Sequence, residues 1–118
     1  MDAITQAVEA FTSRKATSLS DALCREGLRL LAGNLESFHA VPEGGAAGAM
    51  LCGSFMAGLG LAMARLGLVH GIAHPLGARF GVPHGHVCAV ALPLARELNR
   101  PAIGAKYETL GSAVGCDI

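Results

Sequence analysis

Residues 67–86 read GLVHGIAHPLGARFGVPHGH, and they hold four of the chain's five histidines together with five glycines and two prolines. A helix that only had to bury one face would use Leu, Ala and Val, whereas repeated glycine lets a backbone approach another group closely. The stretch therefore indicates a functional site rather than part of a hydrophobic core.

The first part of the chain carries helical signals. Apolar side chains at positions 4, 7, 8 and 11 follow the spacing of one helix face, which predicts a helix over residues 2–12 with Asp2 near its N-cap. After the polar stretch SRKATS, Ser18 or Ser20 is expected to cap a second helix that ends near residue 34. Residues 35–41 add a further helical turn.

Glycine and proline divide the second half of the chain. Residues 42–45, Pro-Glu-Gly-Gly, predict a loop before a long helix over residues 46–64. The expected breaks within the histidine stretch are Gly67, Pro75 and Gly81, and the expected later helices run from Pro83 to about residue 99 and onward from Pro101. No segment alternates apolar and polar residues for long enough to predict a strand, so the fold class is all-α.

The charge balance and the cysteines limit the kind of protein. The 118 residues suffice for one domain, and nine acidic residues balance nine basic ones. Without a positive excess or a basic run interleaved with aromatics, nucleic-acid binding is not expected. The N-terminus lacks the basic region of a signal peptide. The cysteines at positions 24, 52, 88 and 116 form no Cys-x-x-Cys pair, and they are interpreted as reduced core thiols of a cytoplasmic protein.

Residues 46–64, AAGAMLCGSFMAGLGLAMA, contain no charge, which raises the alternative of a membrane-spanning helix. Glycine and alanine contribute little transfer free energy, so the stretch is interpreted as a helix of a soluble domain that does not contact a membrane. Its small residues allow neighbouring helices to approach. We expect this helix to be the most buried element of the fold, with Cys52 inside.

The histidines have a spacing that suits a metal ion. His70 and His74 are four residues apart and share one helix face, and His84 follows ten residues later. Imidazole binds Fe(II), Zn(II), Co(II) and Ni(II). Asp2 and Gln6 also share a helix face, although Asp2 can equally be an N-cap. From spacing alone, the alternative that each histidine is a core residue with a backbone partner stays open.

Four segments together carry a family resemblance: MDAITQAVEAF at residues 1–11, SDALCREGLRLL at 20–31, GLVHGIAHPLGARFGVPHG at 67–85 and LPLARELN at 92–99. They resemble the metal-binding helical domain of the iron-containing (group III) alcohol dehydrogenases, which share their fold with dehydroquinate synthase-like proteins. The likeness runs from residue 1 to about residue 115. Its most specific part is His-x-x-x-His-Pro-x-Gly followed by Pro-His-Gly.

The resemblance implies a metal centre. In that family a divalent ion, Fe(II) or alternatively Zn(II), is held by an Asp and a His one helical turn apart and by two further histidines. These positions correspond here to Asp2, Gln6, His70 and His84, and the active-site histidine beside the nicotinamide corresponds to His74. Gln6 stands where the family pattern has histidine. Its amide oxygen is a poorer donor than imidazole, which implies weaker metal binding.

The resemblance also implies oxidoreduction of a small alcohol or aldehyde with NAD or NADP, which a nucleotide-binding α/β domain binds in the family. That domain precedes the segment seen here, so residues 1–118 are interpreted as a partial helical metal-binding domain. We expect this fragment to be inactive alone and to self-associate as a homo-oligomer through its uncovered cleft. Two alternatives remain: a non-catalytic truncated helical module, and a relative of the metal-independent maleylacetate reductases.

Overall fold

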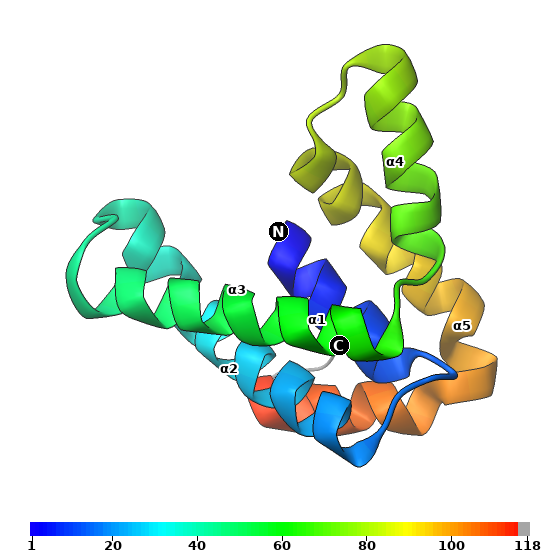
Figure 1. Ribbon diagram of the computed structural model, residues 1–118, viewed down its shortest axis with the longest axis horizontal. Coiled ribbons are helices and arrows are strands. Elements are labelled where there is room, and N and C mark those ends of the chain that lie inside the picture. Colours follow the sequence, from blue (N-terminus) through cyan, green and yellow to red (C-terminus); the bar gives the residue numbers. More distant parts are fainter. Residues whose placement is uncertain (116–118) are drawn as a thin grey trace.

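The computed structural model describes residues 1–115, which contain five helices and no strand (Figure 1). The helices are α1 (Asp2–Thr12), α2 (Ser18–Ala40), α3 (Gly44–Ala64), α4 (Leu68–Phe80) and α5 (His84–Val114). The prediction of an all-α domain is confirmed.

The beginnings of α1 and α2 follow local hydrogen bonding. α1 has the predicted bounds, but Met1 holds the N-cap position and Asp2 is the first helical residue. The cap of α2 is Thr17, one residue before Ser18 and three before Ser20, the two expected caps. The Thr17 hydroxyl accepts from the Ser20 amide at 3.2 Å, and Ser20 Oγ accepts from the Thr17 amide at 2.8 Å. This reciprocal capping box satisfies two of the donors that a helix start leaves free.

α2 continues to Ala40 as one helix, so its predicted end near residue 34 was too early. The further helical turn expected over residues 35–41 is the last part of this same helix, and Val41 is its C-cap. In the structure the Asn34 side-chain amide donates to the Leu30 carbonyl at 2.8 Å, one turn back along the same helix. The side chain is therefore satisfied inside the helix and does not end it.

Gly67 and Gly81 bound α4 as predicted, and Gly81 has the left-handed conformation, with φ 66°. The expected break at Pro75 is wrong, because Pro75 lies inside α4. A proline ring clashes with the carbonyl four residues earlier, here that of Gly71. α4 nevertheless continues through Pro75 to Phe80.

α5 begins one residue later than predicted, since Pro83 is its N-cap and His84 its first residue. The helix does not stop near residue 99. It runs past Pro101 and changes direction at Ile103, whose φ of −137° and ψ of 21° are not helical. The predicted boundary at Pro101 is thus a kink inside α5, visible where its two halves meet in Figure 1.

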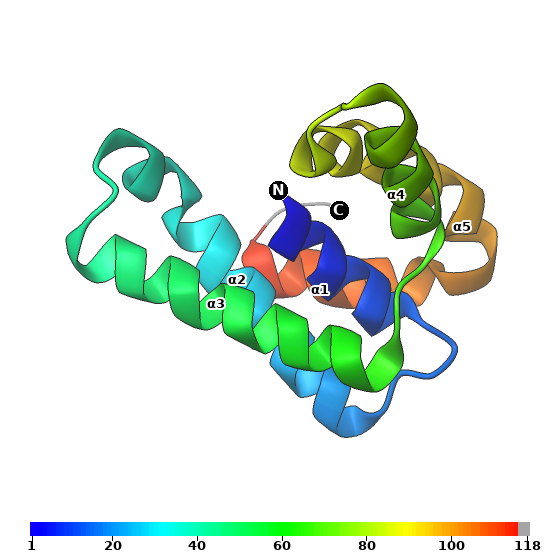
Figure 2. The ribbon, with the colours of Figure 1, turned by 45° about the horizontal axis from the view of Figure 1, so that its top comes forward.

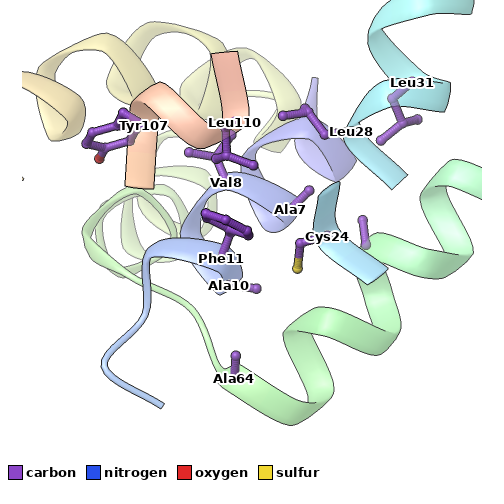
Figure 3. Packing of buried hydrophobic residues seen from close by; sticks show 11 residues of the cluster. Ala7, Val8, Ala10, Phe11, Cys24, Leu28, Leu31, Ala64, Tyr107 and Leu110 are labelled. Carbon is purple, nitrogen blue, oxygen red and sulfur yellow. The ribbon is translucent and has the colours of Figure 1, made fainter. Parts of the chain in front are cut away.

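The main core surrounds α1, which packs against α2, α3 and the second half of α5 (Figure 3). Its buried residues are Ala7, Val8, Ala10, Phe11, Cys24, Leu28, Leu31, Ala57, Ala64, Tyr107 and Leu110. Six of the eleven residues of α1 are buried, so α1 is the central element of the domain.

The expectation that α3 is the most buried helix is wrong. Only Gly53, Ala57, Gly60 and Ala64 are buried, while the opposite side exposes large apolar side chains, with Leu51 74% and Phe55 66% exposed. The small residues recur at helical spacing and form one narrow contact surface. The absence of charged residues in α3 therefore does not mean that the whole helix is buried. Within residues 1–115, α3 is the one helix long and apolar enough to cross a membrane by length and composition, with a mean hydropathy of 1.6.

The interpretation of the cysteines as core thiols is correct for Cys24 and Cys88 and wrong for Cys52, which is exposed on α3. Cys52 is adjacent to Gly53 but points away from the contact surface that Gly53 forms with α2, because neighbouring residues of a helix point about 100° apart. Cys116 lies outside the described residues.

α4 and the first half of α5 form a hairpin that extends from the rest of the domain (Figure 2). The hairpin has a small core of its own, made of Val69, Ala73, Val87, Cys88 and Ala95. α4 packs mainly against α5 and touches α1 over a short length only. The N-terminal turn of α1 lies against the hairpin, and this junction contains the candidate site.

Candidate metal centre

Three helices bring Asp2, His70 and His84 together. Asp2 is the first residue of α1, His70 is the third residue of α4, and His84 is the first residue of α5. Asp2 Oδ1 lies 3.0 Å from His70 Nε2 and 3.5 Å from His84 Nε2. The rings of the two histidines have their centroids 5.3 Å apart. One carboxylate oxygen and two imidazole nitrogens thus converge from segments that are far apart in the sequence.

Glu9 holds the His70 ring in this position. Its carboxylate is buried, with Oε2 2.6 Å from His70 Nδ1, and Oε1 accepts from the Val69 amide at 2.6 Å. A carboxylate at Nδ1 makes that nitrogen the hydrogen-bond donor and directs Nε2 towards Asp2. This is the arrangement that commonly orients a metal-binding histidine from behind.

Sequence reasoning missed Glu9, although a signal was present. Glu9 is seven residues after Asp2, two helical turns along the same face of α1, and it stands among the apolar residues Ala7, Val8, Ala10 and Phe11. The structure also explains why position 67 is glycine. A Cβ on Gly67 would lie 2.8 Å from Glu9 Oε1, so a side chain there would displace the carboxylate.

His74 lies beside the cluster rather than inside it. Its ring stacks on the His84 ring at 5.1 Å with an interplanar angle of 17°, and its centroid is 5.8 Å from that of His70. His74 is exposed, whereas His70 is 2% exposed. The partners of buried His70 are carboxylates, so the alternative of a core histidine with a backbone partner does not describe it.

Gln6 contacts the site through Asp2. Its amide nitrogen Nε2 donates to Asp2 Oδ2 at 3.1 Å, from one turn further along α1. The two oxygens of Asp2 therefore have different neighbours, because Oδ2 faces the Gln6 amide while Oδ1 faces the two histidines.

Cys88 is the second residue that sequence reasoning did not place at the site. Its sulfur lies 3.9 Å from Asp2 Oδ1, and one ligand atom from each of Asp2, His70, His84 and Cys88 can be chosen so that all four lie within 4.8 Å of one another. Burial, with further contributions from the charges of Asp2 and Glu9, raises the pKa of the Cys88 thiol above its ordinary value. The spacing of four residues from His84 was the available signal, since it puts both side chains on one face of α5.

The donor set fits a divalent transition-metal ion. Imidazole nitrogens combined with a carboxylate oxygen suit Fe(II), Zn(II), Co(II) and Ni(II) better than the all-oxygen sites that Mg(II) and Ca(II) prefer. The Glu9 carboxylate behind His70 supports the same conclusion, because it prepares the free Nε2 to act as a donor.

A family comparison identifies the class of protein. The profile described as "Fe-containing alcohol dehydrogenase family, C-terminal" matches residues 1–118. The chain belongs to the iron-containing alcohol dehydrogenase family and corresponds to its C-terminal helical domain.

Individual relatives show how much of a longer enzyme the chain represents. It is 37% identical over 118 residues to lactaldehyde reductase of Escherichia coli K12 and 37% identical over 119 residues to 1,3-propanediol dehydrogenase of Klebsiella pneumoniae. In both cases the alignment covers 100% of this chain and 31% of the relative. The chain therefore spans about a third of the length of these relatives.

Solved structures share the helical arrangement. The chain superposes on a crystal structure of 1,3-propanediol oxidoreductase with a TM-score of 0.94 at 37% identity, covering 98% of this chain and 30% of the other. The corresponding values for alcohol dehydrogenase from Oenococcus oeni are 0.95, 34%, 98% and 30%. α3, with its exposed apolar side, lies within the aligned region that these alcohol dehydrogenases share with the chain.

Proposed function

We propose that the chain is the metal-binding helical half of an NAD(P)-dependent alcohol dehydrogenase that interconverts a small alcohol and its aldehyde. Asp2, His70 and His84 hold Fe(II), or alternatively Zn(II), and Gln6 stands at the fourth position of the family pattern, where its amide orients Asp2 or a water molecule. The observation that carries the proposal is the convergence of Asp2 Oδ1 with His70 Nε2 and His84 Nε2 at 3.0 and 3.5 Å.

The reaction removes a hydride and a proton from the alcohol. A divalent ion, when bound, supplies a Lewis acid that lowers the pKa of the alcohol oxygen, and the hydride passes from the substrate carbon to NAD or NADP. Asp2 contributes one negative charge to the site. Glu9 keeps the His70 ring oriented, and His74, exposed and stacked on His84, lines the nicotinamide pocket and relays the hydroxyl proton to solvent.

The remaining parts of the enzyme lie outside this chain. NAD or NADP is bound by a nucleotide-binding α/β domain outside this chain, which spans about a third of the length of the relatives. Names such as lactaldehyde reductase and 1,3-propanediol dehydrogenase support a small alcohol or aldehyde as substrate. The proposed enzyme is cytoplasmic and homo-oligomeric, and it requires neither nucleic acid nor a membrane.

The metal site is tested by titrating purified, metal-free protein with Zn(II) in a calorimeter. Wild-type protein is expected to bind one ion, and His84→Ala and Asp2→Asn are expected to abolish binding. His86→Ala is the matched control, because His86 is exposed on the same helix and absent from the ligand cluster. Equal loss of binding in the control, or no binding by the wild type, would contradict the proposal.

The activity is tested by following NADH or NADPH formation with 1,2- and 1,3-propanediol. The metal-loaded 118-residue chain is expected to be inactive alone, because residues 1–115 contain no strand that could carry the phosphate-binding loop of a dinucleotide domain. Activity is expected when a nucleotide-binding domain from a relative is fused to it. Metal binding without activity in the fusion would favour the non-catalytic module. Activity in the absence of metal would favour the maleylacetate reductase-like alternative.

A further inference from the structure

We propose that Cys88, and not Gln6, supplies the fourth protein ligand of the metal ion. This inference rests on the proposed metal site and names a donor that is neither the expected residue at position 6 nor part of the family pattern. The resulting ligand set is one carboxylate oxygen, two imidazole nitrogens and one thiolate sulfur.

The separations among the four side chains fit a single ion. With metal bonds of about 2.3 Å to sulfur and about 2.0 Å to oxygen or nitrogen, a tetrahedral site separates sulfur from oxygen by about 3.5 Å and oxygen from nitrogen by about 3.3 Å. The observed distances from Asp2 Oδ1 are 3.9 Å to the Cys88 sulfur and 3.0 and 3.5 Å to the histidine nitrogens. All four donor atoms lie within 4.8 Å of one another, so side-chain shifts of up to about 1 Å bring them to bonding distance.

Gln6 has the wrong group towards the site. A carboxylate oxygen only accepts hydrogen bonds, so the part of the Gln6 amide that faces Asp2 Oδ2 is its NH₂ group. That group cannot bind a cation. The contact instead ties up Oδ2 and leaves Oδ1 directed at the histidines, which makes Gln6 a positioning residue for Asp2.

Cys88 has the position that a ligand needs. It is one helical turn after His84 on α5 and is fully buried, so its sulfur has a defined place next to Asp2. It also belongs to the small core of the α4–α5 hairpin, together with Val69 and Ala73. Binding of the ion to Cys88 forms a metal–sulfur bond and breaks the S–H bond, and the proton passes to solvent.

A thiolate changes which ions the site prefers. Sulfur is a softer donor than an amide oxygen and favours Zn(II) over harder ions such as Mn(II) and Mg(II). The number of protein donors stays at four, as in the family pattern, with a cysteine in place of the third histidine. We therefore expect the site to bind Zn(II) more tightly than Mn(II) or Mg(II).

Cobalt(II) substitution tests the inference without measuring activity. Purified metal-free protein is titrated with Co(II), and the absorption spectrum is recorded. A thiolate ligand is expected to give an intense sulfur-to-cobalt charge-transfer band in the near ultraviolet, in addition to the weaker visible bands of bound Co(II). Cys88→Ser is expected to lose the near-ultraviolet band and to weaken Zn(II) binding at least about tenfold.

Two controls separate Cys88 from the other candidates. The double variant Cys52→Ser/Cys116→Ser is expected to keep the band, because Cys88 remains and the exposed Cys52 is not in the ligand cluster. Cys116 is replaced as well, so that neither of these two thiols can be the source of the band. Gln6→Ala is expected to keep the band as well, since the sulfur remains. The wild-type spectrum is informative by itself, so the test does not depend on Cys88→Ser folding.

The possible outcomes distinguish this inference from the proposed function. Visible bands of bound Co(II) without a near-ultraviolet band in the wild type would overturn Cys88 as a ligand and leave the metal site intact. A band that survives in Cys88→Ser would overturn it too. No Co(II) or Zn(II) binding at all would overturn both the metal site and the fourth ligand.

Discussion

The buried carboxylate of Glu9 accepts two hydrogen bonds, one at each oxygen. One oxygen accepts from the Val69 amide at the start of α4, and the other pairs with His70 Nδ1. Each of the two donors needs its own acceptor oxygen, because a buried donor left without a partner lowers the free energy of unfolding by about 1–3 kcal/mol. The same side chain thus fixes the beginning of a helix and the orientation of a proposed ligand.

Glu9→Gln is expected to weaken Zn(II) binding about 10- to 100-fold, the usual effect of removing the partner behind a metal-binding histidine. The amide has a single acceptor oxygen, so it satisfies either Val69 or His70 but not both. Isothermal titration with Zn(II) measures the change. Glu36→Gln, at an exposed position on α2, is the control and should bind as the wild type does. Unchanged affinity in Glu9→Gln would mean that His70 does not depend on its carboxylate partner.

Cys24 makes stability depend on pH in the alkaline range. Its thiol is fully buried, and burial, aided by the charge of Asp21, raises its pKa from an ordinary value of 9.0 to about 11. In the unfolded chain the thiol ionises near its ordinary value, so between the two pKa values the folded state binds more protons than the unfolded state. Its contribution to stability is therefore complete below pH 9 and is lost as the pH rises towards 11.

The free energy of unfolding is expected to fall by about 2 kcal/mol between pH 9 and pH 11, from the difference between the two pKa values of Cys24. Urea unfolding at several pH values measures it. Cys24→Ala should flatten the slope. A smaller decline remains, because burial also raises the pKa of Tyr107. A wild-type curve as flat as that of Cys24→Ala would show that the thiol does not titrate differently in the two states.

At the scale of elements, α2 and α3 cross at two glycines that face each other. A Cβ on Gly53 would lie 2.9 Å from the Gly27 carbonyl oxygen and 2.9 Å from Leu31 Cγ, and a Cβ on Gly27 would lie 3.0 Å from the Gly53 carbonyl oxygen. The obstacles include backbone atoms, which cannot rotate away as a side chain can. The close approach of these helices therefore depends on the absence of side chains at both positions.

Gly53→Ala is expected to destabilise the fold by about 1–3 kcal/mol, because the added methyl forces the two helix backbones apart. Gly58→Ala on the same helix provides the matched control. A Cβ at Gly58 meets nothing within 4 Å, so alanine should stabilise by up to about 1 kcal/mol through its better helix propensity. Thermal unfolding of both variants and of the wild type measures the two changes in stability. Equal effects at the two positions would contradict the close crossing.

At the scale of the whole molecule, the candidate metal centre joins two parts with separate cores. Asp2 belongs to α1 in the main domain, whereas His70, His84 and Cys88 belong to the α4–α5 hairpin. α4 itself touches α1 over a short length only. An ion bound by all of these residues would connect the hairpin to the rest of the molecule.

Removal of the metal is expected to increase amide hydrogen exchange in α4 and the first half of α5, while α2 and α3 stay unchanged. A ligand that binds only the folded state stabilises it by about 2.7 kcal/mol at a hundred times its dissociation constant, and here the effect falls on the segments that the ion joins. Hydrogen–deuterium exchange with mass spectrometry, with and without Zn(II), measures this. Uniform protection of all five helices would show that the hairpin has no separate stability.

Much of this architecture follows from local patterns. The apolar spacing of residues 2–12 predicted both ends of α1, and Gly67 and Gly81 predicted those of α4, because a helix period and a left-handed glycine are properties of short segments. The end of α2 and the continuity of α4 through Pro75 were not predictable in this way. The residues concerned, Asn34 and Pro75, are common at helix ends, and their places inside α2 and α4 are set by the packing of those helices in the fold.

By itself, the sequence determined the helical class, the family and the histidines of the candidate metal centre, since periodicity and motif spacing are properties of the chain itself. Only the tertiary structure decided that α3 is largely exposed, that Glu9 stands behind His70, and that Cys88 lies next to Asp2. The reason is geometric. A sequence pattern shows which residues share a face of one helix. The packing of α1 against the α4–α5 hairpin decides which residues of the other helices that face contacts.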